Sequence, residues 1–167
     1  MLQDNKLLKL FIHFITGLLL TSCDMIPAVT VWLKNVDFEV DPKANNGNAF
    51  SCHIVIAYSK DLYDKLQNMD SKGYFLNRTS LEKTYKDSIE TFKYDLIPGR
   101  NRLNQEIKLR SYTKAKGAFI FAKYDSQGKF SENIGMTQNL VVRLLPYKME
   151  LHTDIDFDTL ISKLNIG

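Results

Sequence analysis

The sequence has few cysteines, and their positions limit how the fold can be stabilised. It contains two, of which Cys23 follows an apolar run and Cys52 lies in a strand-like segment. If Cys23 is modified, no internal disulfide can form, so the domain must be held together by its core alone. Because Cys52 shares a face with Ile54 and Ile56, we expect a buried and inert thiol there.

The sequence also lacks the patterns of common catalytic and metal sites. His53 and His152 lie far apart, and neither has the spacing of zinc ligands. We expect the His53 side chain to lie at the surface, or to have only part of its hydrogen-bonding capacity satisfied. No Gly-x-Ser-x-Gly elbow, Ser-x-x-Lys pair or phosphate-binding glycine loop occurs. Asp154, Asp156 and Asp158 lack the Gly and the Glu that a calcium loop needs, and are expected at a helix start. The sequence predicts no enzyme, no metal and no cofactor.

A strong excess of charge is missing too. The formal net charge is +3, and no dense basic cluster with interleaved aromatic residues stands out along the chain. Proteins that bind nucleic acid usually show such a footprint. A nucleic-acid partner is therefore not expected.

The N-terminal stretch, in contrast, has the order of parts of a bacterial lipoprotein signal. Lys6 and Lys9 precede an apolar run over residues 10–20. This run is too short to span a bilayer as a helix and is typical of a signal peptide. The run ends in Leu-Thr-Ser-Cys, which resembles a lipobox. We expect residues 1–22 to be removed, and Cys23 to carry a covalent diacylglycerol and an N-acyl lipid. Several acyl chains suffice for stable anchoring.

The remainder is expected to be a tether followed by one domain. Residues 23–28 are predicted as the lipidated tether and residues 29–167 as a single domain, long enough for its own core. The expected location is the outer membrane, facing the periplasm. Asp24 leaves the inner membrane open, because an Asp after the lipidated Cys often retains lipoproteins there in enteric bacteria.

Alternating and β-branched segments predict a mainly β fold, a two-sheet antiparallel β-sandwich with a small helical insertion after the second strand. The insertion is expected as a small lobe at the side of the sandwich. The predicted strands cover residues 29–34, 51–58, 89–96, 103–109, 117–124, 140–145 and 147–153. Helices are predicted over 60–69, 79–86 and 157–164. Residues 35–50 are rich in Asn, Asp and Gly, so they are predicted to form a long loop, which in a compact domain is usually functional or disordered.

The order of these pieces resembles the TssJ family, the outer-membrane lipoproteins of type VI secretion systems. The similar features are the lipobox at Cys23, a strand, an Asn- and Gly-rich loop, and a second strand that runs on into SKDLYDKL. A Leu-x-Pro-Gly turn at residues 96–99 and the segment FIFAKYD at 119–125 also match the family order. The Asn-Ala-Phe at residues 48–50 and Asp24 depart from it.

The resemblance implies a transthyretin-like sandwich of about seven strands that is not an enzyme. It implies binding to the periplasmic part of a TssM-like inner-membrane protein, and through it an indirect link to a TssL-like subunit. The family's contact lies in the loop between the first two strands. Here that loop offers two possibilities: alternating apolar residues form an exposed edge for the partner, or Phe38 folds back on the sandwich. The candidate contact residues are Val36, Asp37, Phe38, Glu39, Val40, Asp41, Asn45 and Asn46.

Two other functions remain open at this point. A ligand- or lipid-binding lipoprotein predicts a sizeable apolar cavity between the sheets, whereas a tether predicts a filled core and an exposed loop. A pilotin-like chaperone would instead carry a secretin to the outer membrane.

Overall fold

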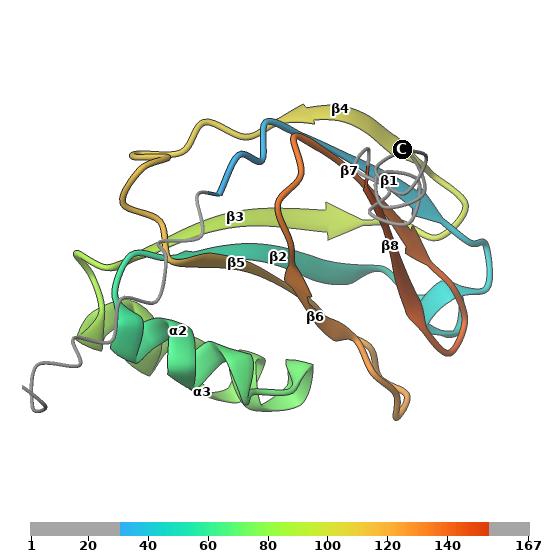
Figure 1. Cartoon of the computed structure of the whole chain (residues 1–167). Helices are drawn as coiled ribbons and strands as arrows, with labels where there is room; N and C mark the ends of the chain where they lie inside the picture. The colour runs from blue at the N-terminus through green and yellow to red at the C-terminus, as the bar shows by residue number, and fades with distance from the viewer. Residues whose placement is uncertain (1–30, 154–167) are drawn as a thin grey trace, which may run out of the picture.

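The computed structural model describes residues 31–153, which form eight strands and two α-helices (Figure 1). The predicted mainly β sandwich, with a helical insertion after its second strand, is confirmed. The elements in chain order are β1 (Asn35–Val40), η1 (Ala44–Gly47), β2 (Phe50–Ala57), α2 (Lys60–Gln67), α3 (Ser71–Thr84), β3 (Ile89–Leu96), β4 (Arg102–Glu106), β5 (Gly117–Ala122), β6 (Ser131–Ile134), β7 (Asn139–Leu144) and β8 (Met149–Thr153).

The strands make two sheets of four, in the orders β4-β1-β7-β8 and β3-β2-β5-β6. Every neighbouring pair is antiparallel except β1 and β7. That pair is parallel, with Asn35 opposite Asn139 and Val40 opposite Leu144. The first sheet is therefore mixed, so the prediction of purely antiparallel sheets holds for the second sheet only.

Side chains from both sheets fill the space between them. Val36, Phe38 and Val40 alternate inward from β1, as period-two strand geometry requires. The ring centroid of Phe38 lies 4.8 Å from that of Tyr94 on β3. From β2, the Cys52 thiol joins the same cluster and is fully buried, as the sequence predicts. Burial raises the pKa of this thiol, so it stays protonated.

The two helices cover the outer face of the second sheet and do not stand beside the sandwich as a lobe (Figure 1). Leu62 and Leu66 of α2, with Tyr74 of α3, pack on apolar side chains of β2 and β5. The ring of Tyr74 stacks on Phe121 at a centroid distance of 4.3 Å. Since β2 and β5 are buried on both faces, they read as nearly continuous apolar runs in the sequence.

The first strand does not lie where the sequence analysis puts it. Residues 31–34 are extended but belong to no strand, and β1 occupies the first part of the segment that was predicted as a loop. The alternation of VDFEV carries the strand signal, whereas the turn signals are confined to residues 41–48. The prediction of a single loop over residues 35–50 is therefore wrong.

Two further elements differ from the prediction. Helix α3 begins at Ser71 rather than near Thr79, because the Asp70 side chain accepts a hydrogen bond from the Gly73 backbone N–H at 2.6 Å and caps the first turn. Strand β6 was missed because its sequence, SENI, is short and polar.

The predicted signal peptide and tether, with Cys23 and Asp24, lie outside the described residues, as do the three C-terminal aspartates and the predicted helix over 157–164. Within residues 31–153, neither helix has the length and apolar character needed to cross a membrane.

Candidate interaction surface

Four connections meet at one end of the sandwich, on the right and lower right in Figure 1. They are the β1–β2 loop (residues 41–49), the β3–β4 turn (97–101), the β5–β6 loop (123–130) and the β7–β8 turn (145–148). We call this region the loop end. It contains what remains of the predicted partner-binding loop.

The β1–β2 loop has a defined backbone. The Asp41 backbone N–H donates to the Leu144 carbonyl at 2.9 Å, which extends the pairing of β1 with β7. Asn45, Asn46 and Gly47 follow with φ values of 46°, 56° and 79°. This left-handed region is open to Gly and is tolerated by Asn better than by most residues. The Asn-Asn-Gly sequence thus permits a tight turn at this point.

Asn45 fastens the loop to the neighbouring β5–β6 loop. Its side chain is 1% exposed, and its Oδ1 accepts a hydrogen bond from the Asp125 backbone N–H at 2.7 Å. Its Nδ2 donates to the Asn48 carbonyl at 3.3 Å and to Asp125 Oδ2 at 3.4 Å. A buried amide with all these partners holds the two loops in one arrangement.

The β3–β4 turn supports the loop from the other side. The Gly99 backbone N–H donates to the Val40 carbonyl at 3.1 Å, and the Val40 N–H donates to Asn101 Oδ1 at 3.0 Å. Gly99 has a φ of 74°, a conformation that side-chain-bearing residues rarely adopt. The Leu-Ile-Pro-Gly motif is thus a turn that packs against Pro42.

Exposed side chains surround an open depression of about 600 Å³ at the loop end. Tyr147 is 75% exposed and Ile97 is 49% exposed. Apolar groups displayed on well-ordered loops are a common feature of protein contact sites. The lining residues of the depression are Pro42, Lys43, Asn46, Gly47, Pro146 and Tyr147.

The predicted apolar edge for a partner does not exist. Val36 and Phe38 are fully buried and Val40 is 4% exposed, so the second possibility, that Phe38 folds onto the sandwich, is the observed one. The alternation of VDFEV reflects a strand with one face in the core rather than an exposed loop.

Asp37, Glu39 and Asp41, three polar members of the candidate set, have structural partners. Asp37 Oδ1 accepts from the Asn104 backbone N–H at 2.5 Å, and Glu39 pairs with Arg143 at 2.6 Å on the outer face of the first sheet. Asp41 accepts from the Lys43 N–H. Of the eight candidates, Asn46 is the exposed one.

Ile97 and Tyr147 were not among the sequence candidates. Each lies beside a proline in a turn, within Leu-Ile-Pro-Gly and Leu-Pro-Tyr-Lys. An apolar or aromatic residue next to turn-forming residues was the available signal, but such a residue can equally fold inward.

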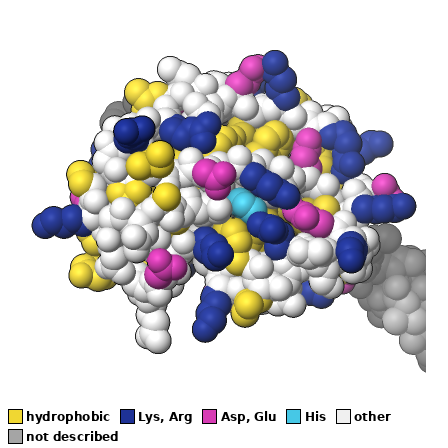
Figure 2. Space-filling model, turned by 180° about the vertical axis from the view of Figure 1, so that it is seen from behind, with side chains coloured by type: hydrophobic (Ala, Val, Ile, Leu, Met, Phe, Trp, Pro, Cys, Tyr) yellow, Lys and Arg dark blue, Asp and Glu magenta, His cyan; other side chains and the backbone are white. Residues whose placement is uncertain are grey.

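The prediction that His53 lies at the surface is wrong, because its side chain is 2% exposed beneath α3. His53 Nδ1 lies 3.0 Å from the Tyr74 hydroxyl. Burial, with the nearby charges of Arg78 and Lys93, lowers the pKa of His53 to about 4. Figure 2 shows the face behind Figure 1, on which Lys and Arg side chains are interspersed with Asp and Glu side chains. The environment is that of a neutral structural histidine.

The main hollows among residues 31–153 lie outside the space between the two sheets. Besides the depression at the loop end, a groove of about 660 Å³ runs between α3 and the β5–β6 loop, and the sandwich interior is filled by the core cluster. Among residues 31–153, no three His, Cys, Asp or Glu side chains come together in a group that could hold a metal.

The chain is a two-sheet β-sandwich with a helical layer on one sheet and ordered loops at one end. Lipoproteins of type VI secretion systems share this fold. TssJ1 from Pseudomonas aeruginosa is 13% identical, with a TM-score of 0.57 over 72% of this chain and 95% of that one. Lip from Serratia marcescens, a membrane-bound component of the type VI secretion system, is 11% identical, with a TM-score of 0.53 over 74% and 97%.

A chain from a type VI membrane complex gives 12% identity and a TM-score of 0.54 over 72% and 98% of the two chains. At these identities the likeness is one of fold. Comparison of the sequence itself with protein-family models and with curated proteins finds no match.

Proposed function

We propose that this chain is a lipid-anchored structural component of a type VI secretion membrane complex, with no catalytic role. The observation that carries the proposal is the fold. Three chains from type VI secretion systems match it over at least 95% of their own length. The matches also take in 72–74% of this chain, so the likeness extends over most of the domain.

In this proposal, the lipid is attached at Cys23. The Lys residues, the apolar run and the Leu-Thr-Ser-Cys sequence occur in the order that lipid attachment requires. A diacylglycerol with an N-acyl chain would hold the domain at the outer membrane, facing the periplasm. If Asp24 acts as a retention signal, the inner membrane takes its place.

The partner in this proposal is the periplasmic part of a TssM-like inner-membrane protein, with a TssL-like subunit linked through it. We assign the contact to the loop end. Its support is the combination of an ordered β1–β2 loop with the exposed side chains of Tyr147 and Ile97. A pre-ordered surface loses little conformational entropy on binding, which favours affinity.

The filled sandwich interior disfavours the ligand-binding alternative, which requires an apolar cavity between the sheets. A pilotin-like role requires a secretin as the partner, and is separated from the tether by the identity of that partner.

The test is affinity purification of the full-length tagged protein from its own host in mild detergent, followed by mass spectrometry. We expect a large inner-membrane protein with a long periplasmic segment among the co-purifying proteins. Recovery of a secretin would favour the pilotin role. Recovery alone, or with a bound small molecule, would overturn the tether.

A further inference from the structure

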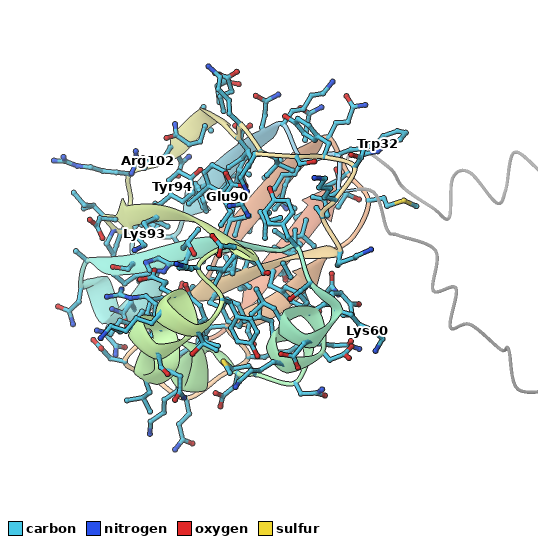
Figure 3. All side chains as sticks on the ribbon, turned by 90° about the vertical axis from the view of Figure 1, so that its left-hand side faces the viewer. Trp32, Lys60, Glu90, Lys93, Tyr94 and Arg102 are labelled. Atoms are coloured by element: carbon cyan, nitrogen blue, oxygen red, sulfur yellow. The ribbon has the colours of Figure 1, made fainter. Side chains whose placement is uncertain are left out.

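The chain enters the fold at the end opposite the loop end, on the left in Figure 1, and displays a tryptophan there. Val31 and Leu33 point into the core, whereas Trp32 and Lys34 face outward. Trp32 is the single tryptophan of the chain and is 49% exposed. Figure 3 shows its side chain directed away from the body of the domain. We call this region the entry end.

A second exposed apolar side chain follows β6 close to the entry segment. Met136 is 44% exposed. Two residues further on, the Gln138 carbonyl accepts hydrogen bonds from the backbone N–H groups of Lys34 and Asn35, at 2.8 and 3.0 Å. These bonds hold the connection after β6 beside the entering chain, so Met136 belongs to the entry end.

The segment beside the entry end carries basic side chains and no acidic ones. Residues 107–116 read IKLRSYTKAK, with four basic residues and no acidic one. The Ile107 backbone N–H donates to the Lys34 carbonyl at 2.7 Å, which places this segment beside the entry. Lys34, Lys114 and Lys116 are exposed and take part in none of the ion pairs seen within residues 31–153.

Two other basic residues of the entry end already have partners. Arg110 lies over the Tyr58 ring at 4.6 Å and donates to the Asp87 carbonyl, while Lys108 pairs with Glu106 through two exposed side chains. Exposed pairs of this kind are weak, so Lys108 remains able to exchange its partner.

The distance to the expected anchor restricts which surface can reach a membrane. Cys23 precedes Val31 by eight residues, which span at most about 29 Å when fully extended. A domain of the size of residues 31–153 has a radius of gyration of about 14 Å, hence a diameter of about 35 Å. A tether shorter than the domain keeps the entry end next to the bilayer.

We propose that the entry end is a membrane-contact surface for an anionic phospholipid bilayer. Trp32 and Met136 sit at the interface, and Lys34, Lys108, Lys114 and Lys116 face lipid phosphates. The inference rests on the proposed attachment at Cys23 and adds an orientation to it, because the loop end then faces away from the membrane. Tryptophan favours the bilayer interface, where its ring is partly buried and its N–H stays hydrated. Lysines close to an anionic membrane surface are attracted to its lipid headgroups.

The experiment uses the fluorescence of the single tryptophan. Full-length lipidated protein is reconstituted into phosphatidylethanolamine–phosphatidylglycerol vesicles, with and without bromine-labelled acyl chains that quench tryptophan on contact. We expect at least a twofold loss of emission with the brominated lipid, and a smaller loss in vesicles without phosphatidylglycerol. Flotation of the same samples measures anchoring independently.

A matched pair of charge reversals supplies the control. The triple variant Lys34→Glu, Lys114→Glu and Lys116→Glu should float with the vesicles yet lose most of the quenching. Reversal of Lys72, Arg100 and Lys123 to Glu changes the charge equally at positions away from the entry end, and should keep the quenching. Parent protein that floats without quenching, or equal quenching in both triple variants, overturns the membrane-contact surface alone. Protein that does not float overturns the anchoring and this inference together.

Discussion

The Asn45 side chain accepts a hydrogen bond from the backbone N–H of Asp125 across 80 residues of sequence, at 2.7 Å. This bond joins the β1–β2 loop to the β5–β6 loop, and so connects the two sheets at the loop end. The arrangement makes the surface that we assign to the partner a property of the folded domain, present before any partner arrives.

Replacing Asn45 with Ala should destabilise the domain. The change leaves the partly buried Asp125 N–H without its acceptor, which costs about 1 kcal/mol, and places Ala in a left-handed conformation that costs about 1 kcal/mol more. Urea unfolding followed by circular dichroism measures the difference. Asn48→Ala is the control, because Asn48 is exposed and has a φ of −86°. Equal midpoints for the two variants would contradict the role assigned to Asn45.

Phe38→Ala should cost about 3–5 kcal/mol of unfolding free energy, as is typical for a buried aromatic side chain. Thermal or denaturant unfolding of the variant measures the loss. The matched change Leu103→Ala removes a side chain that is 55% exposed, and should stay within about 0.5 kcal/mol of the parent. A well-folded Phe38→Ala protein that merely fails to co-purify with its partner would restore the contact role expected from the sequence.

Tyr147→Ala combined with Ile97→Ala should leave the unfolding midpoint nearly unchanged, since both side chains are largely exposed. The amount of co-purified partner should fall at least tenfold, as expected when aromatic and aliphatic anchors leave an interface. Quantitative mass spectrometry of the affinity eluate measures it, with Leu103→Ala as the exposed apolar control. Undiminished recovery would move the contact away from the loop end.

His53 should make stability fall in acid. Its folded-state pKa of about 4 lies below the unfolded value near 6.5. Between these values the unfolded chain binds more protons, so stability decreases as the pH falls from about 6.5 to 4, by up to about 3 kcal/mol. His53→Gln should flatten this part of the stability–pH curve.

The control for that curve is His152→Gln, since the His152 side chain is 50% exposed. The parent slope should persist in this variant. A titration of His53 near pH 6.5 in the folded protein, followed by NMR, would contradict the prediction.

Thiol counting tests the lipid on Cys23 without isolating it. Cys52 is buried, and an acylated Cys23 has no free thiol, so the native mature protein should show no thiol that reacts with a maleimide or a disulfide reagent. In denaturant we expect one reactive thiol, from Cys52. A thiol that reacts before denaturation would show that Cys23 is unmodified.

The elements with strong periodicity were predictable and the interaction surface was not. β2, β3 and α2 carry patterns that depend on local geometry alone, and they appear within one or two residues of their predicted bounds. β1 was displaced because VTVWLK and VDFEV both suit a strand, and only pairing with β4 and β7 selects the second.

The partner surface and the entry end needed the tertiary structure. Tyr147 and Asn46 line one depression although they belong to separate connections, and Ile97 lies on a third. Residues 107–116 lie beside the segment that contains Trp32 only in the folded chain. Local sequence carries no information on which distant segments become neighbours in the folded chain. The same limit explains His53, whose burial is caused by a helix that begins eighteen residues later.

The parallel pairing of β1 with β7 has a consequence for how the chain acquires its structure. β1 has no lasting partner until β4 and β7 exist, and β7 begins at Asn139, so the first sheet closes only when nearly all of residues 31–153 are present. Such long-range closure is slow relative to local contacts. If a translocase moves this polypeptide through a membrane from its N-terminus, the first sheet therefore stays unformed until translocation is nearly complete.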